Sequence, residues 1–241
     1  MLQTQAFEGL ADAQDVDLQG WIDEVSHFKY FSEALTRFDS AADASLKDEA
    51  GETKRKGPVV VEVGSWKGLS TGKMADHLKR RGYEAPMVVA IDTWLGSPEH
   101  VRSDLLGPRV RGVPQLYGKF LANMRHFGLH DVVYPFPISS AQGGQFLVNE
   151  GFEADVVYID AGHEYEAVAL DIAVFWRLIV PGGCMILDDY KWPGVAKAVH
   201  EFVEVLHPEE VDDFEVTGNV SRIRRKVAPP DVTEPADELT I

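Results

Sequence analysis

The chain has 241 residues, 45% of them hydrophobic, which suits one large α/β domain with a sizeable buried core. Its 39 acidic residues outnumber 23 lysines and arginines and give a formal net charge of −16, so nucleic acid and anionic membranes are disfavoured partners because both would be repelled. The single cysteine, Cys184, excludes an internal disulfide. We see no signal-peptide pattern and no apolar run long enough for a bilayer, and we expect a cytoplasmic protein.

Residues 1–57 are predicted to be a helical extension followed by a linker. An amphipathic helix running to about residue 38 is predicted from apolar residues at helical spacing: Leu18, Trp21, Ile22, Val25 and Phe28. Residues 39–57 are rich in Ala, Asp, Lys and Glu, and we interpret them as a polar linker or a solvated helix. The apolar N-terminal helix could serve as a contact in a homo-oligomer.

Residues 58–227 alternate predicted strands with predicted helices. The strands are predicted at 59–63, 87–91, 132–135, 155–159, 184–187, 214–216 and 221–225, and the helices at 70–81, 116–127, 168–179 and 194–206. This alternation predicts a Rossmann-like, doubly wound α/β fold, in which helices cover both faces of a mostly parallel seven-stranded sheet. Residues 228–241 are acidic and contain proline, which is typical of a disordered tail.

The first predicted strand leads into a glycine turn, Glu62-Val63-Gly64-Ser65-Trp66-Lys67-Gly68. Its two glycines let the backbone approach a ligand, although a tight turn without a ligand would look the same. The spacing differs from the three-glycine fingerprint of dinucleotide sites. Glu62 suits a cationic ammonium and would repel a pyrophosphate. Asp92, at the end of the second strand, can accept hydrogen bonds from ribose hydroxyls or cap a helix.

The pattern Glu62-x-Gly64-x-x-x-Gly68 resembles motif I of class I S-adenosylmethionine-dependent methyltransferases, and the resemblance covers about residues 58–226. It implies S-adenosylmethionine as the cofactor. The residues that it implies around the cofactor are Glu62, Gly64, Ser65 and Gly68 at the methionine part, Asp92 at the ribose, and Ser140 in an adenine-side loop Ser139-Ser140-Ala141-Gln142. Trp94 is expected either to pack on the adenine or to belong to the core or a lid.

Acidic residues follow the fourth and fifth predicted strands. Asp160 ends one strand and Asp188 and Asp189 end its neighbour, so three carboxylates should converge. Crowded like charges are costly unless a cation or protons neutralise them, and carboxylate oxygens suit Mg²⁺ or Mn²⁺. A role as caps of the following helices is the alternative. His163, close to Asp160, is the candidate general base, with a helix cap as its alternative.

This second pattern resembles metal-dependent O-methyltransferases that act on sugar hydroxyls of macrolide natural products. The resemblance implies Asp160, Asp188 and Asp189 as metal ligands and His163 as the base. We therefore predict methyl transfer to a hydroxyl of a sugar, a polyol or another small natural product. A nicotinamide-dependent oxidoreductase on a similar fold and a non-catalytic S-adenosylmethionine-binding module remain as alternatives.

The stretch 95–114 is rich in glycine and proline and carries Arg102, Arg109 and Arg111 in an otherwise acidic chain. It can be interpreted equally as a lid that closes over the substrate or as a solvated surface loop. His100 lies within this stretch and is the further histidine of interest.

Overall fold

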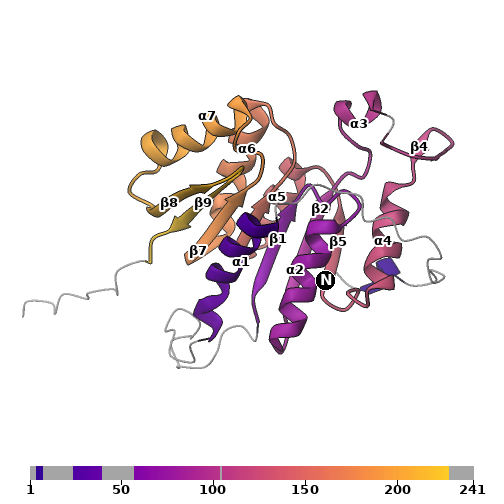
Figure 1. The fold of residues 1–241 in the computed structure, drawn as a ribbon, viewed down its shortest axis with the longest axis horizontal. Coiled ribbons are helices and arrows are strands. Elements are labelled where there is room, and N and C mark those ends of the chain that lie inside the picture. Colours follow the sequence, from indigo (N-terminus) through magenta and orange to yellow (C-terminus); the bar gives the residue numbers. More distant parts are fainter. Residues whose placement is uncertain (1–3, 8–23, 40–56, 104, 228–241) are drawn as a thin grey trace, which may run out of the picture.

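A seven-stranded sheet forms the centre of the molecule in the computed structural model, which describes residues 4–7, 24–39, 57–103 and 105–227. The strands lie in the order β5-β2-β1-β6-β7-β9-β8 (Figure 1). The parallel strands are β1 (Val59–Val63), β2 (Met87–Asp92), β5 (Val133–Pro137), β6 (Ala154–Ile159) and β7 (Ile179–Leu187). The antiparallel pair β8 (Val211–Thr217) and β9 (Val220–Arg225) completes the sheet. The Rossmann-like fold and the seven strands are thus confirmed.

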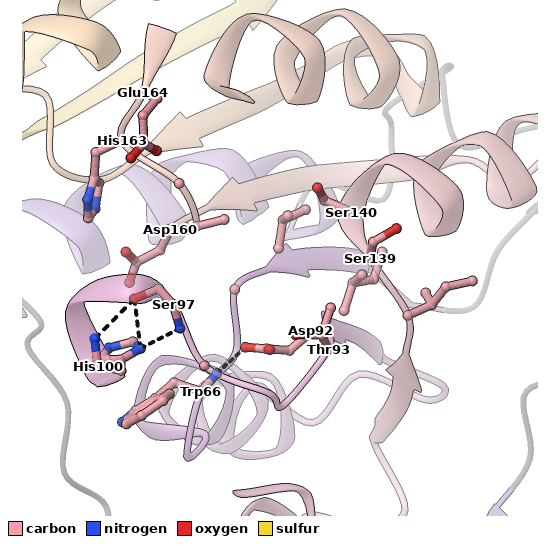
Figure 2. Close-up of a pocket in the computed structure, with 17 residues that line it drawn as sticks. Trp66, Asp92, Thr93, Ser97, His100, Ser139, Ser140, Asp160, His163 and Glu164 are labelled. Atoms are coloured by element: carbon pink, nitrogen blue, oxygen red, sulfur yellow. Dashed lines mark hydrogen bonds between the residues drawn. The ribbon is translucent and has the colours of Figure 1, made fainter. Parts of the chain in front are cut away.

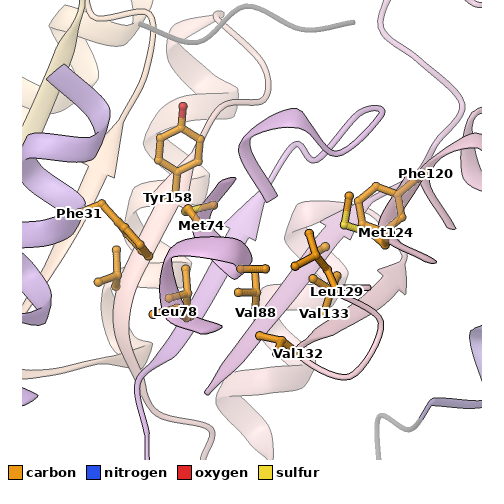
Figure 3. Close-up of a cluster of buried hydrophobic side chains, with 14 of the residues drawn as sticks. Phe31, Met74, Leu78, Val88, Phe120, Met124, Leu129, Val132, Val133 and Tyr158 are labelled. Carbon is orange, nitrogen blue, oxygen red and sulfur yellow. The ribbon is translucent and has the colours of Figure 1, made fainter. Parts of the chain in front are cut away.

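Helices cover both faces of this sheet, because its central strands are apolar on both sides. One face carries α1 (Glu24–Asp39), α2 (Leu69–Arg81) and α4 (Leu116–His126), and the other carries α5 (Ser140–Asn149), α6 (Tyr165–Phe175) and α7 (Pro193–Glu201). Phe31, Leu78 and Phe120 belong to the first core (Figure 3), and Leu147 and Ile172 belong to the second. The turn η3 (Trp176–Leu178) extends α6, the π-helical η4 (Phe202–Leu206) extends α7, and η1 (Thr4–Phe7) is a separate short turn.

The helix α1 packs within the chain. Tyr30, Phe31 and Leu35 are almost fully buried in the core of its face. The predicted helix included residues 18–23, which lie outside the described residues, as do most of the linker, 40–56, and the tail, 228–241. No helix in the described part of the chain is both long and apolar enough to cross a bilayer.

A small lobe replaces the irregular stretch expected at 95–114. It contains α3 (Pro98–Arg102) and a hairpin of β3 (Arg109–Val110) and β4 (Val113–Pro114), and it projects beyond the ends of β2 and β5 (Figure 1). Leu95, Val101, Val110 and Val113 are more than half exposed on it. The lobe therefore stands at the edge of the sheet where ligands bind in this fold.

Two boundaries differ from the prediction. The segment 139–142, expected as a loop, begins α5, and the Ser139 side chain caps the helix by accepting a hydrogen bond from the Gln142 N–H. The turn expected at Pro181-Gly182-Gly183 lies inside β7, which starts at Ile179. Both changes leave the ends of the strands, and hence the site, where they were predicted.

Candidate active site

A pocket of about 360 Å³ lies at the carboxyl ends of β1, β2 and β6. Its lining residues are Val63, Gly64, Trp66, Ile91, Asp92, Thr93, Gly96, Ser97, His100, Ile138, Ser139, Ser140, Asp160, Ala161, Gly162, His163 and Glu164. In Figure 2, Ser139 and Ser140 stand at one end of the pocket and His163 and Asp160 at the other, with Asp92 between them. Of the predicted cofactor residues, Gly64, Asp92 and Ser140 line this pocket.

The turn after β1 needs glycine at position 64. Gly64 has φ +92°, and a Cβ atom there would lie 1.8 Å from the carbonyl oxygen of Asp160. A side chain would therefore collide with the backbone that follows β6. This close approach is what lets two neighbouring strand ends form one continuous wall of the pocket.

Glu62 lies beneath this turn and is not among the residues that line the pocket. It is fully buried and accepts hydrogen bonds from Ser65 Oγ at 2.7 Å, from Ser70 Oγ at 2.5 Å and from Thr71 Oγ1. Burial raises the pKa of Glu62, and the three hydroxyls oppose that rise. Ser65 and Gly68 also lie outside the lining, so these motif residues shape the turn and the first turn of α2.

Asp92 fastens two loops while it faces the pocket. Its Oδ2 accepts a hydrogen bond from the Trp66 N–H at 2.8 Å, and its Oδ1 accepts one from the Trp94 N–H at 2.7 Å. Both tryptophans have positive φ, 48° for Trp66 and 52° for Trp94, an uncommon conformation that these bonds help to hold. Burial raises the pKa of Asp92, whereas these N–H groups lower it.

Trp94 belongs to the core, which is one of the surroundings that the sequence offered for it. Its side chain is 2% exposed and packs against Tyr117 and Phe120 with ring centroids 4.8 Å apart in each pair. Its Nε1 donates a hydrogen bond to the Trp66 carbonyl oxygen at 2.6 Å. The sequence offered both the core and the adenine as surroundings for Trp94, and the structure selects the core.

The acidic residues lie close together as expected, but the group of candidate ligand atoms includes a histidine. Ligand atoms of Asp160, His163 and Asp189 all lie within 4.8 Å of one another. Asp188 is buried behind them, and its two oxygens accept hydrogen bonds from the Asp189 N–H at 2.7 Å and from Tyr158 Oη at 3.0 Å. This group contains His163 and two of the three predicted aspartates, and Asp188 lies outside it. Burial and the neighbouring carboxylates raise the pKa of Asp160 well above its usual value.

His163 is held by contacts that the sequence did not predict. Its Nε2 lies 2.9 Å from Asp189 Oδ2, and its ring stacks on Trp192 with the centroids 4.6 Å apart. Asp189 Oδ1 accepts a hydrogen bond from Asn219 Nδ2 at 2.9 Å, which comes from the β8–β9 turn. No sequence signal identified Asn219, because only the folded sheet brings this turn beside β7.

The fold and the pocket together define a class I methyltransferase: a seven-stranded sheet with a glycine turn, an acid at the end of β2 and a ligand pocket across the strand ends. A family model described as a methyltransferase domain matches residues 61–190, more than half of the chain, and the protein belongs to this family. It is an S-adenosylmethionine-dependent methyltransferase, and the nicotinamide-dependent alternative is set aside.

Similar proteins were found by comparison of sequences and of structures. An uncharacterised protein of Acanthamoeba polyphaga mimivirus is 21% identical over 181 residues, covering 72% of either chain. The calicheamicin methyltransferase CalS11 is 18% identical with a TM-score of 0.51, over 83% of this chain and 80% of that one. The O-methyltransferase NovP is 17% identical with a TM-score of 0.55, over 82% and 80%. At this identity the structures show a shared fold.

Proposed function

We propose that the protein transfers the methyl group of S-adenosylmethionine to a hydroxyl oxygen of a small molecule, with a divalent metal bound beside the cofactor. One observation carries the proposal. Asp160 and His163 line the cofactor pocket, and the same two residues line a small acidic cavity with Asp188 and Asp189. A base and a cluster of carboxylates therefore border the space where a methyl acceptor would meet the cofactor.

The donor atoms at this position fit Mg²⁺ or Mn²⁺. Ligand atoms of two carboxylates and an imidazole lie within 4.8 Å of one another, and hard oxygen donors favour these ions. Burial and then repulsion from Asp188 and Asp189 raise the pKa of Asp160, and a cation would relieve that repulsion. Asp160 and Asp189 would hold the metal, with His163 adjacent. When bound, such a metal lowers the pKa of a hydroxyl that it contacts.

His163 is suited to remove the proton of the acceptor. A carboxylate can only accept a hydrogen bond, so the neutral ring carries its proton on Nε2, toward Asp189, and offers its lone pair on Nδ1. The stack on Trp192 and the bond from Asn219 to Asp189 fix this orientation. A general base in such a position typically contributes roughly 10²–10⁴-fold in rate.

The acceptor is proposed to be a sugar, a polyol or another natural product with vicinal oxygens. CalS11, a structure of similar fold, is named as a TDP-rhamnose 3′-O-methyltransferase, which supports a sugar hydroxyl. The net charge of −16 supports the absence of a nucleic-acid or membrane partner. A contact between copies through the N-terminal helix remains a further proposal.

The test measures how turnover depends on the metal and on His163. A panel of vicinal diols and catechols is offered with S-adenosylmethionine and Mg²⁺, and S-adenosylhomocysteine release is measured with and without EDTA. We expect turnover to depend on the metal and to fall by roughly 10²-fold or more in His163→Ala, in kcat and kcat/KM alike. His126→Ala, an exposed histidine at the end of α4, is the control. Full activity in EDTA would refute the metal, and a normal kcat in folded His163→Ala would refute the base.

A further inference from the structure

The lobe at 95–114 contributes two polar side chains to the cofactor pocket. Ser97, the residue before α3, and His100, within α3, both line the pocket. In Figure 2 both lie at the end of the pocket that also holds Asp160 and His163, away from Ser139 and Ser140. They therefore stand where the amino-acid end of the cofactor would lie if its adenine occupies the serine end.

The ring of His100 has a defined tautomer. Its Nδ1 accepts a hydrogen bond from the Ser97 backbone N–H at 3.1 Å, and Ser97 Oγ lies 3.0 Å from the same atom. A backbone N–H can only donate, so Nδ1 carries no proton and the neutral ring bears its hydrogen on Nε2. His100 is thus a hydrogen-bond donor at Nε2, unlike His163, whose proposed basic atom is Nδ1.

The ring of His100 also stacks on a tryptophan whose backbone is held by hydrogen bonds. It stacks on Trp66 with the centroids 3.8 Å apart and the planes at 23°. The Trp66 N–H donates a hydrogen bond to Asp92, and the Trp66 carbonyl accepts one from Trp94 Nε1, so both backbone polar groups of Trp66 are held in place. The position of His100 is therefore coupled to the same carboxylate that is expected to bind the ribose.

Charge distinguishes the two sides of this end of the pocket. The amino-acid end of S-adenosylmethionine carries a carboxylate as well as an ammonium. Asp160 stands on one side with Asp188 and Asp189 behind it, and would repel that carboxylate. Among the described residues that line the pocket there is no lysine or arginine. The lobe side, with Ser97 and His100, is the side that supplies side-chain donors.

We propose that His100, positioned by Ser97 and Trp66, donates a hydrogen bond from Nε2 to the carboxylate of the cofactor's amino-acid end. The lobe is then part of the cofactor site, whatever it does toward the acceptor. This inference rests on S-adenosylmethionine as the cofactor, and it is tested in EDTA, without the proposed metal or acceptor.

The test compares two ligands that differ only in the part His100 would bind. S-adenosylhomocysteine carries the amino-acid end, and 5′-methylthioadenosine lacks it. Calorimetry on the full chain in EDTA should show that His100→Ala lowers the affinity for S-adenosylhomocysteine by about tenfold or more. This is the size expected for the loss of a hydrogen bond to a charged group. Binding of 5′-methylthioadenosine should change by less than about twofold. His100→Gln, which restores a donor near the Nε2 position, should recover part of the loss.

Ser97→Ala should give a smaller selective loss, because the backbone N–H of residue 97 still fixes the ring. The double variant should bind no worse than His100→Ala alone, since Ser97 acts through His100. His126→Ala serves as the matched control. Equal losses for both ligands, or no loss for either, would overturn the proposal. Wild-type protein that binds neither ligand would instead refute the cofactor assignment itself.

Discussion

At the scale of single residues, Asp92 combines a structural and a ligand-binding role. Its two oxygens already accept the Trp66 and Trp94 N–H groups, and it faces the pocket with its remaining lone pairs. We predict that Asp92→Ala weakens S-adenosylhomocysteine binding by about 1–3 kcal/mol and also lowers the melting temperature, because two N–H groups lose their acceptor. Calorimetry and thermal melting measure both. Asp76→Ala, on α2 and outside the pocket, is the control, and unchanged affinity in a folded Asp92→Ala would exclude the ribose contact.

Asp171 is a second carboxylate whose surroundings make it sensitive to pH. It lies on α6, is 4% exposed, and is hydrogen-bonded to Ser140 at the pocket wall. Burial raises its pKa from 3.8 to about 6, and Ser140 opposes the rise. The folded state therefore binds this proton more tightly than the unfolded chain does. Its contribution to stability is present below about pH 4 and is lost as the pH rises through about 6.

We predict that Asp171→Asn stabilises the protein relative to wild type at pH 7 and that this advantage shrinks as the pH falls toward 4. A shift of this size corresponds to about 3 kcal/mol across the window. Urea unfolding of both proteins from pH 4 to 8 isolates the titration of one group. Glu166→Gln, an exposed acid on the same helix, should show no comparable trend. A difference that is flat with pH would contradict the assignment.

Residue identities at the site were predictable where a strand end fixes them. Asp92, Asp160, His163 and Gly64 follow buried strands, so the sheet itself delivers them to the pocket. The orientations of Glu62 and Asp188 were not predictable, because neighbouring side chains decide which way they face. Three hydroxyls draw Glu62 beneath its turn, and Tyr158 holds Asp188 behind Asp189. The sequence predicts which residues lie at the strand ends, but it does not predict their hydrogen-bond partners.

At the scale of elements, α1 is fastened to the sheet by a buried ion pair. Arg37 Nη2 lies 3.2 Å from Asp155 Oδ1, Arg37 Nη1 donates to the Pro181 carbonyl at 3.2 Å, and Asp155 also accepts the Val59 N–H at 2.8 Å. The side chain of Asp155 is fully buried. Removing the arginine would leave this carboxylate without its cation at the start of two central strands.

We therefore predict that Arg37→Ala destabilises the protein by about 3–5 kcal/mol, as breaking a buried pair does. Urea unfolding at pH 7 measures the loss. Arg80→Ala, which breaks the exposed pair with Asp76, should cost less than about 1 kcal/mol. Equal small effects in both variants would show that α1 depends on its apolar contacts rather than on this pair.

The helix α5 shows why one element escaped sequence prediction. Its sequence contains Gly143 and Gly144, and glycine is a poor helix former. A Cβ atom at Gly143 would lie 2.8 Å from Ile138 Cγ2, and one at Gly144 would lie 2.5 Å from Val174 Cγ1. Close packing against β5's end and α6 thus favours the residues that local propensity disfavours. Periodicity predicted the other long helices because their apolar faces carry no such conflict.

At the scale of the whole molecule, an acidic chain brings three aspartates together where the metal is proposed to bind. Asp160, Asp188 and Asp189 meet at one edge of a chain whose net charge is −16. Ligands that bind only the folded state stabilise it by mass action, by about 2.7 kcal/mol at one hundred times Kd. For a domain of this size that corresponds to a rise of roughly 5–11 °C in melting temperature. NAD should produce no such rise.

Melting experiments with both ligands test this arrangement. We predict that S-adenosylhomocysteine raises the melting temperature in EDTA, since Asp92 and the serine end of the pocket lie apart from the acidic cluster. Mg²⁺ should add a separate rise by relieving repulsion among the aspartates. Asp160→Asn should melt higher than wild type in EDTA and lose most of the Mg²⁺ response. Because any cation screens an acidic surface, KCl at matched ionic strength is the control. A Mg²⁺ shift that KCl reproduces, or that survives in Asp160→Asn, would place the effect on the general surface charge and refute a metal at this cluster.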